Sequence, residues 1–213
     1  MQRSGLTIGD IKLILITGMP RSGTSFMGHV FGSHGQFMKP PLYTTVGFNP
    51  TFAFNLMEPS RIATLCAMKG STSQDFLAGI ADMKSHWKYV DNEKVIKVPQ
   101  LSFFPDVCGE FSKIIVCVRE VDEKYLKSAI GHNMAGWLMA KPYFLESLKD
   151  RTLEGLAKLW KKKAEELSHY NKDRTYFYRF GDKSSFDAVL KNFTNDQSVI
   201  DDAWEKNWRG SRF

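Results

Sequence analysis

A glycine-rich segment near the N-terminus has the spacing of a phosphate-binding loop. Gly18 and Gly23 lie five residues apart, as in the pattern G-x-x-x-x-G-K-[ST] that cradles nucleotide phosphates. A short apolar run precedes this segment and a helix-like stretch follows it, so backbone N–H groups at a helix N-terminus would converge on an anion. Thr24 occupies the position where that pattern has its lysine. This one difference decides which kind of phosphate chemistry the loop could support.

The loop carries a cation of its own in place of the missing lysine. Arg21 lies between the two glycines, and the amides of residues 22–25 with the hydroxyls of Thr24 and Ser25 could hold one phosphate. A nucleoside triphosphatase uses the lysine on the β- and γ-phosphates and also needs a strand-end aspartate for Mg²⁺. The matching strand here ends in Arg119 instead. The pattern therefore favours a phosphate-bearing donor that is handled by cations, without a metal.

Strands and helices alternate along the chain, which is typical of a parallel sheet covered on both faces. We expect strands at residues 11–17, 94–98, 113–118 and 175–180. We expect helices at residues 24–32, 60–69, 73–83, 101–111, 122–130, 153–170, 184–193 and 199–208. The prediction is a single α/β domain over residues 1–213, with three α/β/α layers and a central parallel sheet.

Several segments resemble the sulfotransferases that use 3′-phosphoadenosine 5′-phosphosulfate (PAPS). The 5′-phosphosulfate loop of that family reads roughly P-[KR]-[ST]-G-[ST]-[ST], and the match runs through Pro20, Arg21, Ser22, Gly23, Thr24 and Ser25. VIKVP at 95–99, followed by FPD at 104–106, is similar to the K-x-P…FP stretch of bacterial-type members. KIIVCVR at 113–119 is similar to a strand whose final arginine grips the 3′-phosphate. YFYRFGDKSSFDAVL at 176–190 is similar to a late strand-and-helix unit, so the resemblance covers residues 13–193.

The resemblance implies a P-loop NTPase-like sulfotransferase fold and transfer of a sulfuryl group from PAPS to a hydroxyl or amine. The products would be the sulfated acceptor and adenosine 3′,5′-bisphosphate (PAP), with no metal. It implies that Arg21 and Lys97 are catalytic cations, which fits the negative charge that develops on the transferred group. It also implies that Arg119 and Ser128 bind the 3′-phosphate.

The match to the family departs at the 3′-phosphate and at the general base. The family usually places a serine eight residues after the arginine, where this chain has Lys127, with Ser128 next; either could make the contact. Pro99 occupies the position of the histidine base of cytosolic members. Residues 39–42 lack the glutamate that some bacterial members use. Glu58, His86 and His132 remain as candidate bases.

Composition limits the other readings without choosing among them. The net charge of +6 fits an anionic ligand, nucleic acid or solubility alone. Three cysteines without C-x-x-C spacing indicate neither a disulfide framework nor a zinc site. No apolar run approaches the ~18 residues of a membrane span. We therefore expect a cytoplasmic protein with no membrane span and no nucleic-acid partner.

Two alternatives to a sulfotransferase stay open from the sequence. One is a nucleotide kinase or NTPase of related fold, and the other is a non-catalytic protein that binds nucleotide or nucleic acid. The acceptor of a sulfotransferase would be a small molecule, a saccharide or a lipid. Residues 36–60, rich in proline and aromatics, are a candidate acceptor region. Oligomeric state is not indicated.

Overall fold

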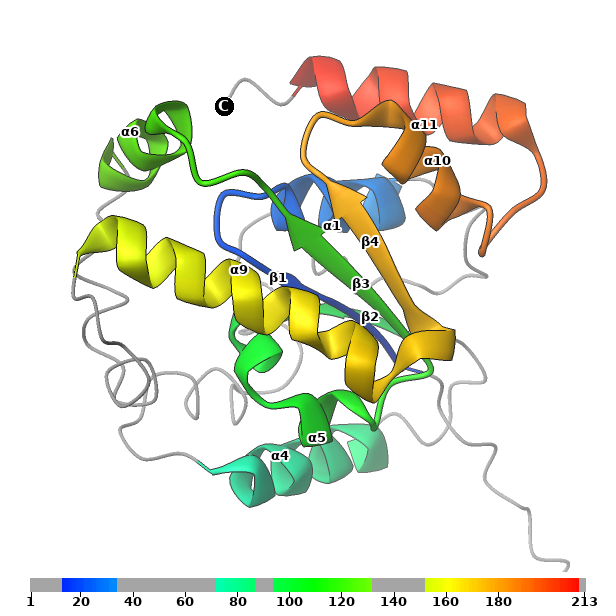
Figure 1. Ribbon diagram of the computed structural model, residues 1–213. Coiled ribbons are helices and arrows are strands. Elements are labelled where there is room, and N and C mark those ends of the chain that lie inside the picture. Colours follow the sequence, from blue (N-terminus) through cyan, green and yellow to red (C-terminus); the bar gives the residue numbers. More distant parts are fainter. Residues whose placement is uncertain (1–12, 34–71, 87–93, 132–151, 211–213) are drawn as a thin grey trace, which may run out of the picture.

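A four-stranded parallel sheet lies at the centre of the fold (Figure 1). The structure is a computed structural model, and it describes residues 13–33, 72–86, 94–131 and 152–210. The strands are β1 (Leu13–Gly18), β2 (Lys94–Lys97), β3 (Lys113–Val118) and β4 (Thr175–Arg179), in the order β2-β1-β3-β4. β1 and β3 are almost entirely apolar because helices cover both of their faces. The α/β class and the parallel sheet are thus confirmed.

Successive residues of β1 enter two different cores, one on each face of the sheet. Leu13 and Leu15 belong to one core, and Ile14 and Ile16 belong to the other. The helices that contribute to the first core are α4 (Ser73–His86), α5 (Pro105–Cys108), α6 (Glu123–Gly131) and α9 (Leu153–Tyr170), with the 3-10 turn η1 (Pro99–Phe103). The second core receives α1 (Thr24–Ser33), α10 (Lys183–Leu190) and α11 (Gln197–Gly210). This arrangement is compatible with three α/β/α layers (Figure 1).

Local sequence explains where several helices begin. The Thr152 side chain accepts a hydrogen bond from the Gly155 N–H at 3.0 Å and caps α9. At the beginning of α4, the Thr72 hydroxyl and N–H both donate to Asp75 Oδ2 at 2.8 Å. The single helix expected over 101–111 is instead two short helices. Pro105 begins the second of them, because proline suits a first turn but interrupts a helix.

The remaining predicted elements agree with the structure to within a few residues where they are described. The turn η2 (Lys172–Arg174) was not predicted. The predicted helix 60–69 and the proline-rich segment 36–60 lie outside the described residues. No helix in the described part of the chain is both long and apolar enough to cross a bilayer.

Candidate phosphate-binding site

The connection between β1 and α1 adopts the left-handed backbone conformation at three positions. Gly18 has a φ of 119°, Arg21 of 59° and Gly23 of 92°. Such reversals turn successive N–H groups toward one point, which is the geometry that attracts an anion. Arg21 pays strain for this conformation because it has a Cβ. These positive φ values, with the N-terminus of α1 directly behind the loop, make it a candidate phosphate-binding loop.

Both glycines are required by close contact as well as by φ. A Cβ on Gly18 would lie 2.1 Å from the carbonyl oxygen of Cys117 on β3. A Cβ on Gly23 would lie 2.7 Å from Cε1 of Tyr178 on β4. The Met19 N–H also donates to Cys117 O at 3.0 Å. The loop is thus pressed against the ends of the two strands beside it.

Two buried hydroxyl groups hold the loop and the end of β1 in place through hydrogen bonds to backbone carbonyls. The Ser22 Oγ donates to Met19 O at 2.5 Å, with Cys117 O also within reach at 2.8 Å, and the residue is fully buried. The Thr17 Oγ1 lies 2.9 Å from Val98 O and 3.0 Å from Pro99 O, and so joins β1 to the segment after β2. The Ser22 side chain therefore faces the protein, and the ligand contact predicted for Ser22 would have to come from its backbone N–H.

Lys97, at the end of β2, brings a buried ammonium group to the loop. Its Nζ donates to Ser25 Oγ at 3.0 Å, and the side chain is 2% exposed. No ion pair among the described residues involves Lys97. Burial lowers the pKa of Lys97 to about 8, an effect that the nearby Cys117 slightly opposes. The structure therefore joins the predicted residues Lys97 and Ser25 around a cation that lacks a counter-ion.

Two arginines meet on the other side of the loop. Arg119, directly after β3, donates from Nη1 to Arg21 O at 3.4 Å. Arg21 in turn donates from Nε to Ser128 Oγ on α6 at 3.2 Å. Burial lowers the pKa of Arg21, and the charge of Arg119 lowers it further. Three predicted site residues from three separate segments are thus in contact, with two like charges held close together.

The residues flanking Arg119 show how its guanidinium is surrounded. Its Cζ lies 4.6 Å from the centroid of the Phe180 ring and 5.7 Å from that of Tyr125. The nearby carboxylates have other partners, since Glu120 pairs with Lys161 at 2.8 Å and Asp122 accepts from the Tyr125 N–H at 2.6 Å. Arg119 therefore makes no ion pair with a carboxylate among the described residues.

Ser128 and Lys127 occupy different environments. Lys127 is exposed and pairs with Glu123 at 2.6 Å on the same helix, whereas Ser128 contacts Arg21. Of the two residues that could follow the family pattern, Ser128 is therefore the one that the structure brings to the loop.

Tyr125 and Phe180 contact Arg119, although the sequence did not predict them as parts of the site. Tyr125 is buried, and burial raises the pKa of its hydroxyl to about 12, although Arg119 and Arg21 act in the opposite direction. It therefore stays neutral beside both arginines. The signal in the sequence was weak: an aromatic residue one turn into the helix after Arg119, and another directly after β4.

The side chains of the three candidate bases fall outside what the structure describes. Glu58 and His132 lie outside the described residues, and His86 is the last residue of α4, with a side chain that is not described. His29 lies one turn beyond Ser25 on α1. Burial lowers the pKa of His29, and Lys97 lowers it further, so His29 is neutral at physiological pH. No group of three or more His, Cys, Asp or Glu residues that could hold a metal ion occurs in the described ranges.

Comparison with protein-family models gave no match, and a comparison with curated proteins gave none either.

Proposed function

We propose that this protein is a PAPS-dependent sulfotransferase of P-loop type, which moves a sulfuryl group to a hydroxyl or amine of a small molecule, saccharide or lipid. The observation that carries the proposal is the buried ammonium of Lys97 at the loop, without a carboxylate partner in the described part of the chain. An unpaired buried charge is costly, and a bound anion would compensate it. PAPS supplies anionic groups at its 5′ end, where Lys97 and the loop amides would hold them.

The proposed reaction uses the cations of the site and needs no metal. The acceptor oxygen or nitrogen forms a bond to sulfur, and the bond from sulfur to the bridging oxygen breaks. The electron pair of that bond stays on the 5′-phosphate of PAP, and the acceptor loses its proton. Arg21 and Lys97 would stabilise the charge that develops on the bridging and sulfonate oxygens. The group that takes the proton is not assigned.

The other end of the donor would lie toward Arg119 and Ser128. A guanidinium can hold phosphate through two parallel hydrogen bonds, and a serine hydroxyl adds one more donor. Arg119 presents such a guanidinium with no carboxylate partner among the described residues. Two cation sites on opposite sides of one loop support a donor with phosphate at two positions, as in PAPS.

A thermal-shift panel with a transfer assay tests the proposal. PAP and PAPS should stabilise the protein by ~2.7 kcal/mol at a hundredfold excess over Kd, with or without Mg²⁺. Radiolabelled PAPS should transfer its label to phenols or amines. Stabilisation by Mg²⁺-ATP and not by PAP would favour a kinase or NTPase instead. Stabilisation by short DNA alone, lost steeply with salt, would favour a nucleic-acid-binding protein.

A further inference from the structure

Helix α11 packs two stacked tryptophans against the beginning of α1. The Trp204 and Trp208 rings lie 4.8 Å apart, with an angle of 10° between their planes. The Phe26 ring lies edge-on to both, with centroids 5.6 Å from Trp204 and 5.5 Å from Trp208. Phe26 belongs to the first turn of α1, directly after the loop. The C-terminal half of α11 therefore lies beside the candidate site, although it is distant in sequence.

Trp208 also contacts the residue that faces Arg119. The centroid of the Trp208 ring lies 5.4 Å from that of Phe180. The Cζ of Arg119 lies 4.6 Å from the centroid of the same Phe180 ring. A Cβ placed on Gly23 of the loop would come within 3.1 Å of Phe180 Cδ2. Phe180 is thus enclosed by the loop, Arg119 and α11.

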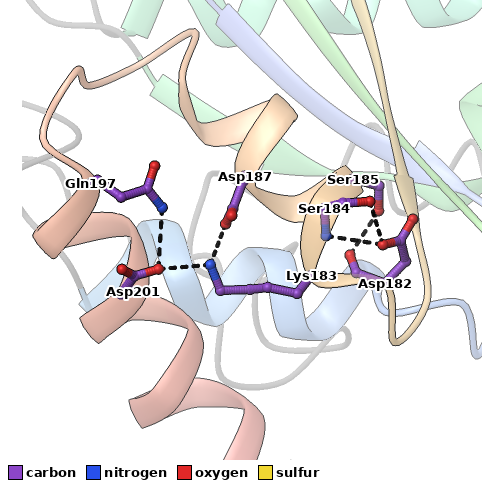
Figure 2. Close-up of polar contacts among 7 residues, drawn as sticks. All are labelled: Asp182, Lys183, Ser184, Ser185, Asp187, Gln197 and Asp201. Atoms are coloured by element: carbon purple, nitrogen blue, oxygen red, sulfur yellow. Dashed lines mark hydrogen bonds and ion pairs between the residues drawn. The ribbon is translucent and has the colours of Figure 1, made fainter.

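An ionic cluster fixes α11 to α10 (Figure 2). The Lys183 Nζ pairs with Asp187 on its own helix and with Asp201 Oδ1 on α11 at 2.8 Å. Gln197 donates from Nε2 to the same Asp201 oxygen at 3.1 Å. This cluster lies near the N-terminal end of α11, and the tryptophans hold the other end. The helix is therefore attached at two points, so that Trp208 has a defined position against Phe180.

We propose that Trp208 is a positioning residue for Arg119, acting through Phe180. The proposal rests on the proposed function, in which Arg119 binds the 3′-phosphate. An arginine side chain has many rotamers, and ordering it on binding would cost affinity. A cation held over an aromatic face loses that freedom before the ligand arrives. Trp208 packs against the Phe180 ring that provides this face. Through this contact, α11 holds the Arg119 side chain in a conformation that can bind phosphate.

Nuclear magnetic resonance of the ligand-free protein tests the positioning directly. The Nε–Hε signal of Arg119, assigned by its loss in Arg119→Lys, should carry an upfield ring-current shift from Phe180. Trp208→Leu should move this signal toward that of a solvent-exposed arginine, and Trp208→Phe should largely restore it. Phe193→Leu is the matched control, because Phe193 packs on Phe31 in the same core, near the start of β3 rather than its end.

Binding and kinetics provide the second readout. Trp208→Leu should weaken PAP binding about fivefold, as expected for loss of an ordered cation–π contact. The KM for PAPS should rise by a similar factor with kcat little changed, and Phe193→Leu should change neither. An unmoved Arg119 signal in Trp208→Leu, or a moved signal with unchanged PAP affinity, would overturn the proposal. Failure of the wild-type protein to bind PAP would overturn the proposed function, while the Arg119 signal would still decide the positioning.

Discussion

The Nζ of Lys97 lies 3.0 Å from the Oγ of Ser25, so a strand beside the loop delivers the ammonium that the loop lacks at position 24. Thr24 is buried at that position and Lys97 reaches the same turn of α1 from β2. The cation is therefore fixed by a sheet strand rather than by the loop. Burial of this ammonium lowers the pKa of Lys97 to about 8.

Lys97→Met should stabilise the ligand-free protein at neutral pH by about 2 kcal/mol, because it removes a desolvated charge. The pKa of Lys97 is lowered from 10.5 to about 8, so between these values the unfolded chain binds more protons than the folded one. Wild-type stability should therefore rise with pH across this window, and the advantage of the variant should shrink. Chemical denaturation at a series of pH values measures both. Lys162→Met, at an exposed position of α9, should show neither effect.

Binding of PAP at a pH near 8 should be accompanied by proton uptake of about half a proton per site, because Lys97 is then half deprotonated and a phosphate anion raises its pKa. Calorimetry in two buffers of different ionisation enthalpy gives the number of protons. Uptake should disappear in Lys97→Met. Uptake that persists unchanged in this variant would assign the proton to another group.

Ser22→Ala and Ser25→Ala should both lower stability, but for different reasons. The Ser22 hydroxyl is buried against two carbonyl oxygens, so its loss should lower the free energy of unfolding by ~1–3 kcal/mol. The Ser25 hydroxyl is the hydrogen-bond partner of the buried Lys97 ammonium among the described residues, so its loss should lower Tm as well and should also reduce turnover. Thermal unfolding and sulfuryl transfer, measured on both variants, compare the two roles. Unchanged turnover in Ser25→Ala would show that its hydroxyl is structural only.

Arg119→Ala should weaken PAP binding by about tenfold or more, since a charged hydrogen-bond partner of a phosphate is lost. Binding of adenosine 5′-phosphate, which has no 3′-phosphate, should change little. Arg21→Ala and Lys97→Ala should mainly lower kcat. Titration of the two nucleotides against Arg119→Ala decides the point: unchanged affinity for PAP would remove Arg119 from the 3′-phosphate site.

The side-chain amide of Gln100 gives a prediction about stability rather than about ligand binding. Its Oε1 is buried without a hydrogen-bond partner in the described structure, three residues after Lys97. An unsatisfied buried carbonyl costs ~1–3 kcal/mol, so Gln100→Met should raise Tm. Differential scanning fluorimetry of the variant, with Ser102→Ala as a control that removes a satisfied hydroxyl, measures the sign. A lower Tm in Gln100→Met would show that the amide is paired in solution.

The sequence predicted elements best where periodicity and burial gave the same answer. The bounds of β3 and α9 are correct to the residue, because β3 is an unbroken apolar run and α9 repeats apolar residues at spacings of three and four. The loop glycines were also predictable, since their spacing is a backbone requirement. In contrast, the two short helices at 99–108 depend on prolines whose effect was not resolved from pattern alone.

It was easier to predict which residues form the site than to predict which of them contact one another. Lys97, Arg119 and the loop were expected together because the resemblance to the sulfotransferases assigns all three to one donor. The Arg21–Ser128 hydrogen bond and the ring of Phe180 beside Arg119 join segments far apart in sequence, and such side-chain contacts depend on packing that no local pattern encodes. The inward turn of the Ser22 hydroxyl is a case in which the residue was predicted but its direction was not.

The position of β1 in the sheet sets an order of events during synthesis. Leu13 pairs with Lys94, and Ile14 pairs with Lys113, so among the described strands the first one gains a partner only after about 80 further residues and its second partner only after about 100. At ~5–20 residues per second this takes several seconds, during which an apolar strand is exposed to wrong partners. The Cys117 carbonyl that anchors the loop arrives last in this group. The loop between β1 and α1 can therefore close against Cys117 only after β3 has emerged, and the apolar strand β1 is prone to aggregation until then.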